Sequence, residues 1–196
     1  MDMQKVGTII VGIIFLGSTI AYAMSFAFSN SQSQAITDPV KGNENAKVTI
    51  VEYTDFSCLP CRDVQGTIEN ILSNYTGDVK LVFKTLPGSE SSLNVTHAAE
   101  CANLQGFFWE YHDRLFEQET PINNQDLVDI ANNLSLDMEE FNQCLKLNSV
   151  RQEVISDLQE ARNKGVRGPP TFFINGEMVE GSRPYYTFES VIERHL

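Results

Sequence analysis

The chain has 196 residues, enough for one domain with a sizeable hydrophobic core and hardly enough for two. Its 26 acidic and 14 basic side chains give a formal net charge of −12, and no cluster of basic residues offsets this average. The sequence pI of about 4.6 therefore argues against an electrostatic surface for nucleic acid or anionic lipid.

The first predicted element is a transmembrane helix at residues 6–28, VGTIIVGIIFLGSTIAYAMSFAF, a stretch without any charged side chain. An apolar run of this length can span a bilayer as a helix. The tripeptide Ala21-Tyr22-Ala23 also fits the small-x-small pattern of a signal peptidase site. Because the apolar run continues past Ala23, we favour an uncleaved anchor over a cleaved signal peptide. Either one would export the rest of the chain.

The predicted organisation follows from this N-terminus. Residues 1–28 are assigned to the membrane anchor or signal sequence. Residues 29–39 are assigned to a linker that begins with the polar stretch SNSQSQ. Residues 40–196 would form the exported domain.

After the linker the sequence predicts a β-α-β unit. Residues 47–53, KVTIVEY, are rich in β-branched side chains and predict a buried strand. Residues 59–74 place apolar side chains at helical spacing, and residues 78–84, DVKLVFK, alternate as a second strand does. Strand, helix and strand in this order imply a parallel pair with a right-handed crossover.

A block of helices is predicted next, because residues 91–164 contain no strand pattern. Gly106 and Pro121 are its expected breaks. The helical patterns cover residues 96–105, 107–116, 124–132, 138–147 and 149–164.

The chain then returns to strands. Residues 171–176 and 177–181 predict two short strands, joined at Asn175-Gly176, a strong signal for a hairpin turn. Residues 188–195 predict a closing helix. The predicted order is β-α-β, a helical insertion at about residues 91–164, and β-β-α, an α/β fold preceded by a transmembrane helix.

The strongest chemical motif is the pair Cys58-Leu59-Pro60-Cys61, which falls at the predicted strand-to-helix junction. A sulfur at a helix N-terminus meets unpaired backbone N–H groups and the positive end of the helix dipole, and both favour the thiolate. Cys58 is therefore the expected nucleophile, and Cys61, one turn deeper, is placed to resolve a mixed disulfide. Pro60 suits the first helical turn.

Two other interpretations of this pair are weaker. A zinc site usually needs a second close pair of ligands, whereas Cys101 and Cys144 stand apart, and a mixed site with His97 is not favoured. A purely structural disulfide across so tight a loop would gain little from loop closure.

Export also bears on the four cysteines, because disulfides persist outside the cytosol and an even count permits full pairing. Asn-x-Ser/Thr sequons are compatible with export, but about two would arise by chance, so they do not establish glycosylation. They occur at Asn74, Asn94 and Asn133.

The chain resembles the DsbA-like thiol:disulfide oxidoreductases, which have a thioredoxin fold interrupted by a helical insertion. Four stretches carry the resemblance, in the family's order, between about residues 38 and 194: VTIVEYTDFSCLPC, HAAECANLQGFFWEYHDRLF, FNQCL and GVRGPPTFFINGE. A single CxxC would be weak, but the set of four is specific. The resemblance implies a redox-active disulfide between Cys58 and Cys61.

The resemblance also implies roles for Pro170 and Glu52. Pro170 matches the cis-proline that faces the active disulfide and helps to bind substrate. Glu52 matches a buried acid that relays the proton of the resolving cysteine. From the residues alone, Glu52 is a carboxylate in an apolar strand, which indicates a raised pKa. An exposed Glu52 on a sheet edge is the alternative.

The substrate-binding residues are expected to be Leu59, Pro60, Pro169 and Pro170. Pro169 departs from many relatives, which have Thr or Val before the cis-proline. Because proline has no N–H, one main-chain donor to an extended substrate would be missing here.

A structural disulfide between Cys101 and Cys144 is favoured, because some relatives bridge such a pair within the insertion. Two buried free thiols are the alternative. His112 and Trp109 are expected in the helical core rather than at a ligand site, and Arg167 is expected to be solvated.

The predicted function is that of a membrane-tethered thiol:disulfide oxidoreductase on the extracytoplasmic side, forming disulfides in other exported proteins. A secreted or periplasmic form after signal cleavage is the alternative location. The resemblance implies reoxidation by a membrane quinone-linked oxidase of the DsbB or VKOR type. We expect a monomer with no metal, no organic cofactor and no nucleic-acid partner. The alternative functions are a disulfide reductase or isomerase, or a non-enzymatic binding or chaperone module.

Overall fold

The computed structural model describes residues 37–118 and 121–196. The predicted anchor at residues 6–28 and the first part of the predicted linker lie outside the described residues. Within the described ranges, no helix combines the length and the apolar character needed to cross a membrane.

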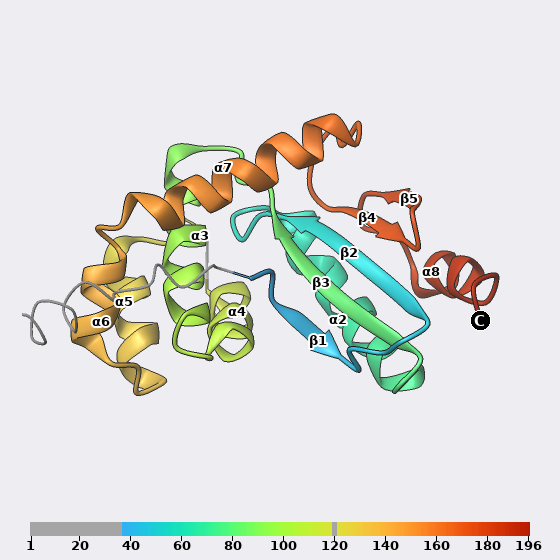
Figure 1. Cartoon of the computed structure of the whole chain (residues 1–196), viewed down its shortest axis with the longest axis horizontal. Coiled ribbons are helices and arrows are strands. Elements are labelled where there is room, and N and C mark those ends of the chain that lie inside the picture. The colour runs from blue at the N-terminus through green and yellow to red at the C-terminus, as the bar shows by residue number, and fades with distance from the viewer. Residues whose placement is uncertain (1–36, 119–120) are drawn as a thin grey trace, which may run out of the picture. The chain divides into compact units, whose positions relative to one another are not determined.

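The described part of the chain folds around a five-stranded sheet with the order β1-β3-β2-β4-β5 (Figure 1). β2 and β3 are parallel, and the other neighbouring strands are antiparallel. The strands are β1 (Val40–Gly42), β2 (Val48–Thr54), β3 (Val79–Thr85), β4 (Thr171–Ile174) and β5 (Glu177–Glu180). The helices are α2 (Leu59–Asn74), α3 (Glu90–Asn103), α4 (Phe108–Glu117), α5 (Asn124–Asn133), α6 (Met138–Cys144), α7 (Asn148–Asn163) and α8 (Tyr185–Ile192). This is the predicted thioredoxin-like order with a helical insertion.

Strand β1 was not predicted. It pairs with β3 as an edge strand, and the backbone N–H of Phe83 donates to the carbonyl of Pro39 at 2.9 Å. Gly42 ends β1 with a φ of 110°, and a Cβ there would lie 2.9 Å from the carbonyl oxygen of Val79. Only glycine fits this close approach of β1 to β3.

The side chains of β2 alternate between the two faces of the sheet. Val48, Ile50 and, further along, Glu52 and Thr54 face α2, and the first two pack with its apolar side chains. On the other face, the hydroxyl of Tyr53 donates to Glu160 of α7 at 2.9 Å. The helices α2 and α7 therefore cover opposite faces of the central strands (Figure 1).

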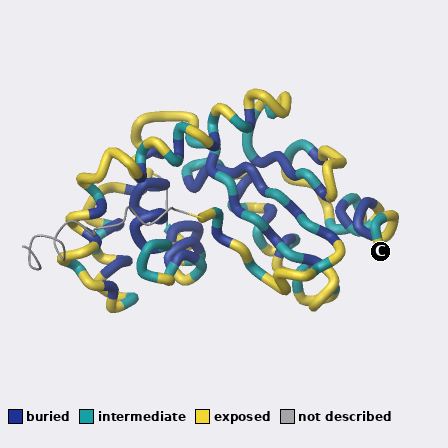
Figure 2. Tube along the Cα trace, in the orientation of Figure 1, coloured by how far each residue is buried: buried dark blue, intermediate teal, exposed yellow. Residues whose placement is uncertain are grey.

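Two hydrophobic cores meet at the start of α2. One core lies in the helical insertion and includes Phe56 and Cys61. The other lies between the sheet, α2 and α8, and includes Val64 and Ile68. Figure 2 shows these buried positions along the inner sides of the insertion helices and along the central strands. The first turn of α2 therefore stands at the boundary of the two cores.

A buried ion-pair cluster links the insertion's last helix to the sheet. The ammonium group of Lys84 on β3 lies 2.9 Å from Asp157 and 3.1 Å from Glu160, both on α7, and 2.7 Å from Asp38. Because the Lys84 side chain is only 12% exposed, its charge depends on these carboxylates for compensation.

Candidate active site

The loop that carries Cys58 is fixed by Asp55, which follows directly after β2. One carboxylate oxygen of Asp55 accepts from the backbone N–H of Ser57 at 2.8 Å, and the other accepts from that of Gly88 at 2.9 Å. This buried carboxylate ties the β2–α2 loop to the β3–α3 loop. Asp55 was not among the predicted site residues, although an Asp that bonds two residues onward is a recognisable turn signal.

Cys58 occupies the N-cap position of α2, with an extended backbone conformation. Its sulfur accepts a hydrogen bond from the backbone N–H of Cys61 at 3.3 Å. The pKa of Cys58 is lowered, first by a hydrogen bond from the Cys61 thiol and then by that backbone N–H, against opposing burial. Cys58 is half-buried and therefore open to an approaching sulfur.

Cys61 lies one turn into α2 and is fully buried. Its pKa is raised, first by its hydrogen bond to the Cys58 sulfur and next by burial. A thiol that stays protonated and shielded cannot compete as the first nucleophile. The geometry thus gives the two cysteines unequal chemistry: an accessible sulfur biased towards thiolate and a buried thiol beside it.

The Gly168–Thr171 loop faces this pair. The Pro169–Pro170 peptide bond is cis, and the carbonyl oxygen of Pro169 lies 3.8 Å from the sulfur of Cys58. Pro170 is buried, and its carbonyl accepts from the backbone N–H of Gly181 at 2.8 Å. Leu59 and Pro60 are exposed beside the thiols, and Pro169 is half-buried. The four residues expected to contact substrate therefore lie around Cys58 or the loop that faces it.

Glu52 is fully buried on a central strand, so the exposed-edge alternative does not hold. Its register neighbours are Phe83 on β3 and Phe172 on β4, which offer no charge. Burial raises the pKa of Glu52 to about 7, although the hydrogen bond from Gln65 acts in the opposite direction. A carboxyl with this pKa can hold or release a proton near neutral pH.

Gln65 connects this carboxyl to Cys61. Its side-chain amide donates to one oxygen of Glu52 at 3.0 Å and to the carbonyl of Cys61 at 3.0 Å. Gln65 was not predicted as a site residue. The signal that could have indicated it is its position one turn after Cys61, on the same side of α2.

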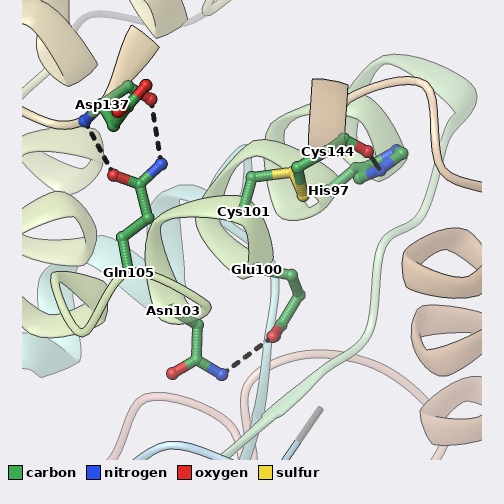
Figure 3. The surroundings of a disulfide bond; sticks show 7 residues. All are labelled: His97, Glu100, Cys101, Asn103, Gln105, Asp137 and Cys144. Carbon is green, nitrogen blue, oxygen red and sulfur yellow. Dashed lines mark hydrogen bonds between the residues drawn. A yellow bond between two sulfur atoms is a disulfide. The ribbon is translucent and has the colours of Figure 1, made fainter. Parts of the chain in front are cut away.

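The second cysteine pair lies in the insertion, where Cys101 of α3 and Cys144 of α6 are joined by a disulfide (Figure 3). Beside it, His97 contacts the carbonyl of Cys144 at 3.2 Å. Sulfurs bonded to each other are not thiolate ligands, so the His97–Cys101–Cys144 group does not offer the donors of a zinc site.

The two remaining candidates, His112 and Arg167, have other partners. His112 is buried among aromatic rings that include Phe56 and Trp109. Arg167 is exposed and forms a two-point ion pair with Glu180 on β5, at 3.0 and 2.7 Å.

Comparisons with known proteins agree with this arrangement. The sequence model of the thioredoxin family matches residues 34–194. The Na⁺/H⁺ antiporter NhaA of Herminiimonas arsenicoxydans is 32% identical over 156 residues, which cover 80% of this chain and 25% of the antiporter. This chain thus spans about a quarter of the length of the curated relatives it matches.

Solved structures give a likeness over most of both chains. A thioredoxin-like oxidoreductase from Silicibacter pomeroyi DSS-3 is 26% identical with a TM-score of 0.74, covering 80% of this chain and 91% of the other. The thiol-disulfide exchange protein alpha-DsbA2 from Wolbachia pipientis is 22% identical with a TM-score of 0.75, covering 82% and 88%. The second likeness concerns the fold alone.

Proposed function

The chain belongs to the thioredoxin family and has the fold of its DsbA-like oxidoreductases, and from this premise we propose that it exchanges thiols and disulfides through Cys58 and Cys61. The observation that carries the proposal is the unequal pair at the start of α2. Cys58 is accessible with a lowered pKa, and Cys61 is buried with a raised pKa.

In the oxidising direction the reaction begins with the Cys58–Cys61 disulfide. A substrate thiolate attacks the sulfur of Cys58, a mixed disulfide forms, and Cys61 leaves as the thiolate and takes up a proton. A second substrate thiolate then attacks the substrate sulfur of the mixed disulfide. Cys58 leaves, the substrate is oxidised by two electrons, and both cysteines are left reduced.

The direction that we propose is disulfide formation in exported proteins. Residues 6–28 would tether the domain to the membrane on the extracytoplasmic side. A membrane quinone-linked oxidase of the DsbB or VKOR type would return the reduced pair to the disulfide. These features rest on the N-terminal sequence and on the family resemblance.

Refolding of a reduced, unfolded protein that needs disulfides tests the activity. The oxidised protein should restore the activity of that substrate protein, Cys58→Ser should not, and Cys101→Ala/Cys144→Ala should retain the activity. Retention by Cys58→Ser would refute the proposed chemistry and favour a binding or chaperone role.

The reduction potential of the Cys58–Cys61 pair tests the direction. A value well above that of thioredoxin, which is about −270 mV, is expected for a protein that forms disulfides. A value near that of thioredoxin would instead favour a reductase.

A further inference from the structure

Two buried polar atoms beneath the redox pair have no hydrogen-bond partner: the second carboxylate oxygen of Glu52 and the hydroxyl of Thr54. Both residues are fully buried. An unpaired polar group in such a place costs about 1–3 kcal/mol of stability. Two of them so close together in the sequence require a physical reason.

Both side chains project from β2 towards α2, because residues two apart in a strand share a face. Gln65 of α2 fixes the Glu52 carboxyl by donating to its other oxygen at 3.0 Å. Since the same amide also donates to the carbonyl of Cys61, its donors are committed. Gln65 therefore has no N–H left to donate to the second carboxylate oxygen of Glu52.

The Thr54 hydroxyl affects the pKa of both Glu52 and Cys61. Burial raises the pKa of Glu52, and the Cys58 sulfur together with burial raises that of Cys61, whereas the Thr54 hydroxyl lowers both. The hydroxyl nevertheless completes no hydrogen bond in this state. Catalytic hydrogen bonds are often long or poorly aligned before the reaction and tighten during it.

We propose that the Thr54 hydroxyl carries the proton between the Glu52 carboxyl and the Cys61 sulfur. This inference rests on the proposed thiol–disulfide exchange and adds the path of its proton. A hydroxyl suits the task because it donates one proton while accepting another. Gln65 is then a positioning residue that holds the carboxyl for this transfer.

The transfer balances in both directions. When Cys61 leaves as a thiolate, Thr54 donates its proton to that sulfur and takes the proton of the protonated Glu52, which becomes the carboxylate. When Cys61 must attack a mixed disulfide at Cys58, its thiol gives its proton to Thr54, and Thr54 passes its own proton to the Glu52 carboxylate. No electrons move through Thr54.

Other groups around Glu52 do not offer the same path. Phe83 and Phe172 flank it in the sheet and carry no exchangeable proton. Tyr53 projects to the opposite face, where its hydroxyl donates to Glu160. A water molecule between Glu52 and Cys61 is the remaining carrier, and the Thr54→Val variant distinguishes it from Thr54.

The test follows how fast Cys61 resolves a mixed disulfide. Oxidised glutathione reacts with the reduced protein at Cys58, releasing one glutathione, and Cys61 then attacks Cys58 and releases the second. Acid quenching and mass spectrometry give the lifetime of the Cys58–glutathione species. We expect Thr54→Val to lengthen this lifetime about tenfold or more, since general acid–base catalysis supplies about 10²–10⁴-fold.

The pH dependence adds a readout that a structural role would not change. In the native protein the resolution rate should rise through the pKa of Glu52, about 7. In Thr54→Val it should rise only at the higher pH where the Cys61 thiol ionises by itself. Asp55 and Asp63, the carboxylates that raise the pKa of Cys58, are present in every variant and shift all profiles alike.

Three further variants make the result specific. Thr54→Ser keeps the hydroxyl and should resolve the mixed disulfide at nearly the native rate. Thr85→Val is a matched control that should resolve the mixed disulfide at the native rate. Thr85 is the register partner of Thr54, but its hydroxyl is bonded to Thr96 at 3.1 Å. In a Glu52→Gln background, Thr54→Val should add little, because both residues serve one transfer.

Thr54→Val should fold at least as stably as the native protein, since it removes an unpaired buried hydroxyl without changing the shape of the side chain. If its lifetimes and pH profile match those of the native protein, water carries the proton and the inference is wrong. Additive effects of Thr54→Val and Glu52→Gln would overturn it as well. Neither result would contradict the proposed thiol–disulfide exchange, which depends on Cys58.

Discussion

The backbone N–H of Cys61 points at the sulfur of Cys58 and donates to it over 3.3 Å. The first turn of α2 thereby supplies the partner that a thiolate at its N-cap needs. The second partner is the Cys61 thiol, whose hydrogen bond is the largest cause of the lowered pKa of Cys58. One helical turn thus differentiates two chemically identical side chains.

Alkylation should reveal this difference. In the reduced protein at mildly acidic pH, we predict that iodoacetamide modifies Cys58 well before Cys61, because the buried thiol is shielded and its pKa is raised. Cys61→Ala should raise the pKa of Cys58, because it removes the largest cause of the lowered value, and burial outweighs the backbone N–H that remains. Peptide mapping after short exposures measures both, and faster labelling of Cys61 would reverse the assigned roles.

The disulfide in the insertion should stabilise the fold without taking part in exchange. It closes a loop with a sequence separation of 43 residues, for which the chain-entropy model gives about 4 kcal/mol. We predict that Cys101→Ala/Cys144→Ala loses up to about that much free energy of unfolding in urea. Its exchange rate on a model peptide should be retained, and a large loss of that rate would place the pair in the reaction.

Glu100 should make stability depend on pH. It is 5% exposed on α3 (Figure 3), and burial raises its pKa from 4.5 to about 8, although Asn103 donates to it. The folded state therefore keeps a proton that the unfolded state loses above its own pKa, so this contribution is full at low pH and falls as pH rises to about 8.

Glu100→Gln keeps the acceptor for Asn103 and removes the titration. The variant should be as stable as the native protein near pH 4 and more stable near pH 8, by roughly 4 kcal/mol at most. Urea unfolding at the two pH values measures the difference. Glu110→Gln, an exposed control on α4, should show no such divergence, and equal pH profiles for native protein and Glu100→Gln would refute the prediction.

Pro169 should weaken the docking of peptides. Its carbonyl lies beside the Cys58 sulfur, but its nitrogen has no hydrogen to donate to an extended chain. Pro169→Thr and Pro169→Ala both restore an N–H, so we predict that both bind a peptide ligand more tightly, by up to about tenfold for one hydrogen bond. The reduction potential should change little, and unchanged or weaker affinity in both variants would contradict the argument.

The sequence predicted the order of the elements because hydrophobic periodicity is local information. It missed β1, because three residues without a buried side chain become a strand only by pairing with β3, a partner about forty positions away. It also started α3 too late. That helix begins at Glu90, after a cap in which Ser89 and Ser92 bond to each other's backbone N–H, and Ser92 replaces the Glu or Gln that the pattern normally has.

The residues of the candidate site were likewise predicted in part. The thiols were identified from their spacing and position, since a CxxC at a strand-to-helix junction has few other uses. The contact of Gln65 with Glu52 and the unpaired, buried hydroxyl of Thr54 were not predicted, because they depend on which face of α2 meets which face of β2. The ion-pair cluster around Lys84 joins residues far apart in the chain, and no local sequence pattern predicts such a contact.

The buried position of the Cys101–Cys144 bond would also protect the protein from the proposed exchange reaction. An incoming thiolate must reach a sulfur atom before it can displace another, so attack depends on access. Cys101 is 0% exposed and Cys144 is 6% exposed, whereas Cys58 is open to its surroundings. Burial of both sulfurs therefore makes thiolate attack on the Cys101–Cys144 disulfide slow. The protein could therefore carry out the proposed exchange among free thiols and mixed disulfides while the bond between α3 and α6 stays intact.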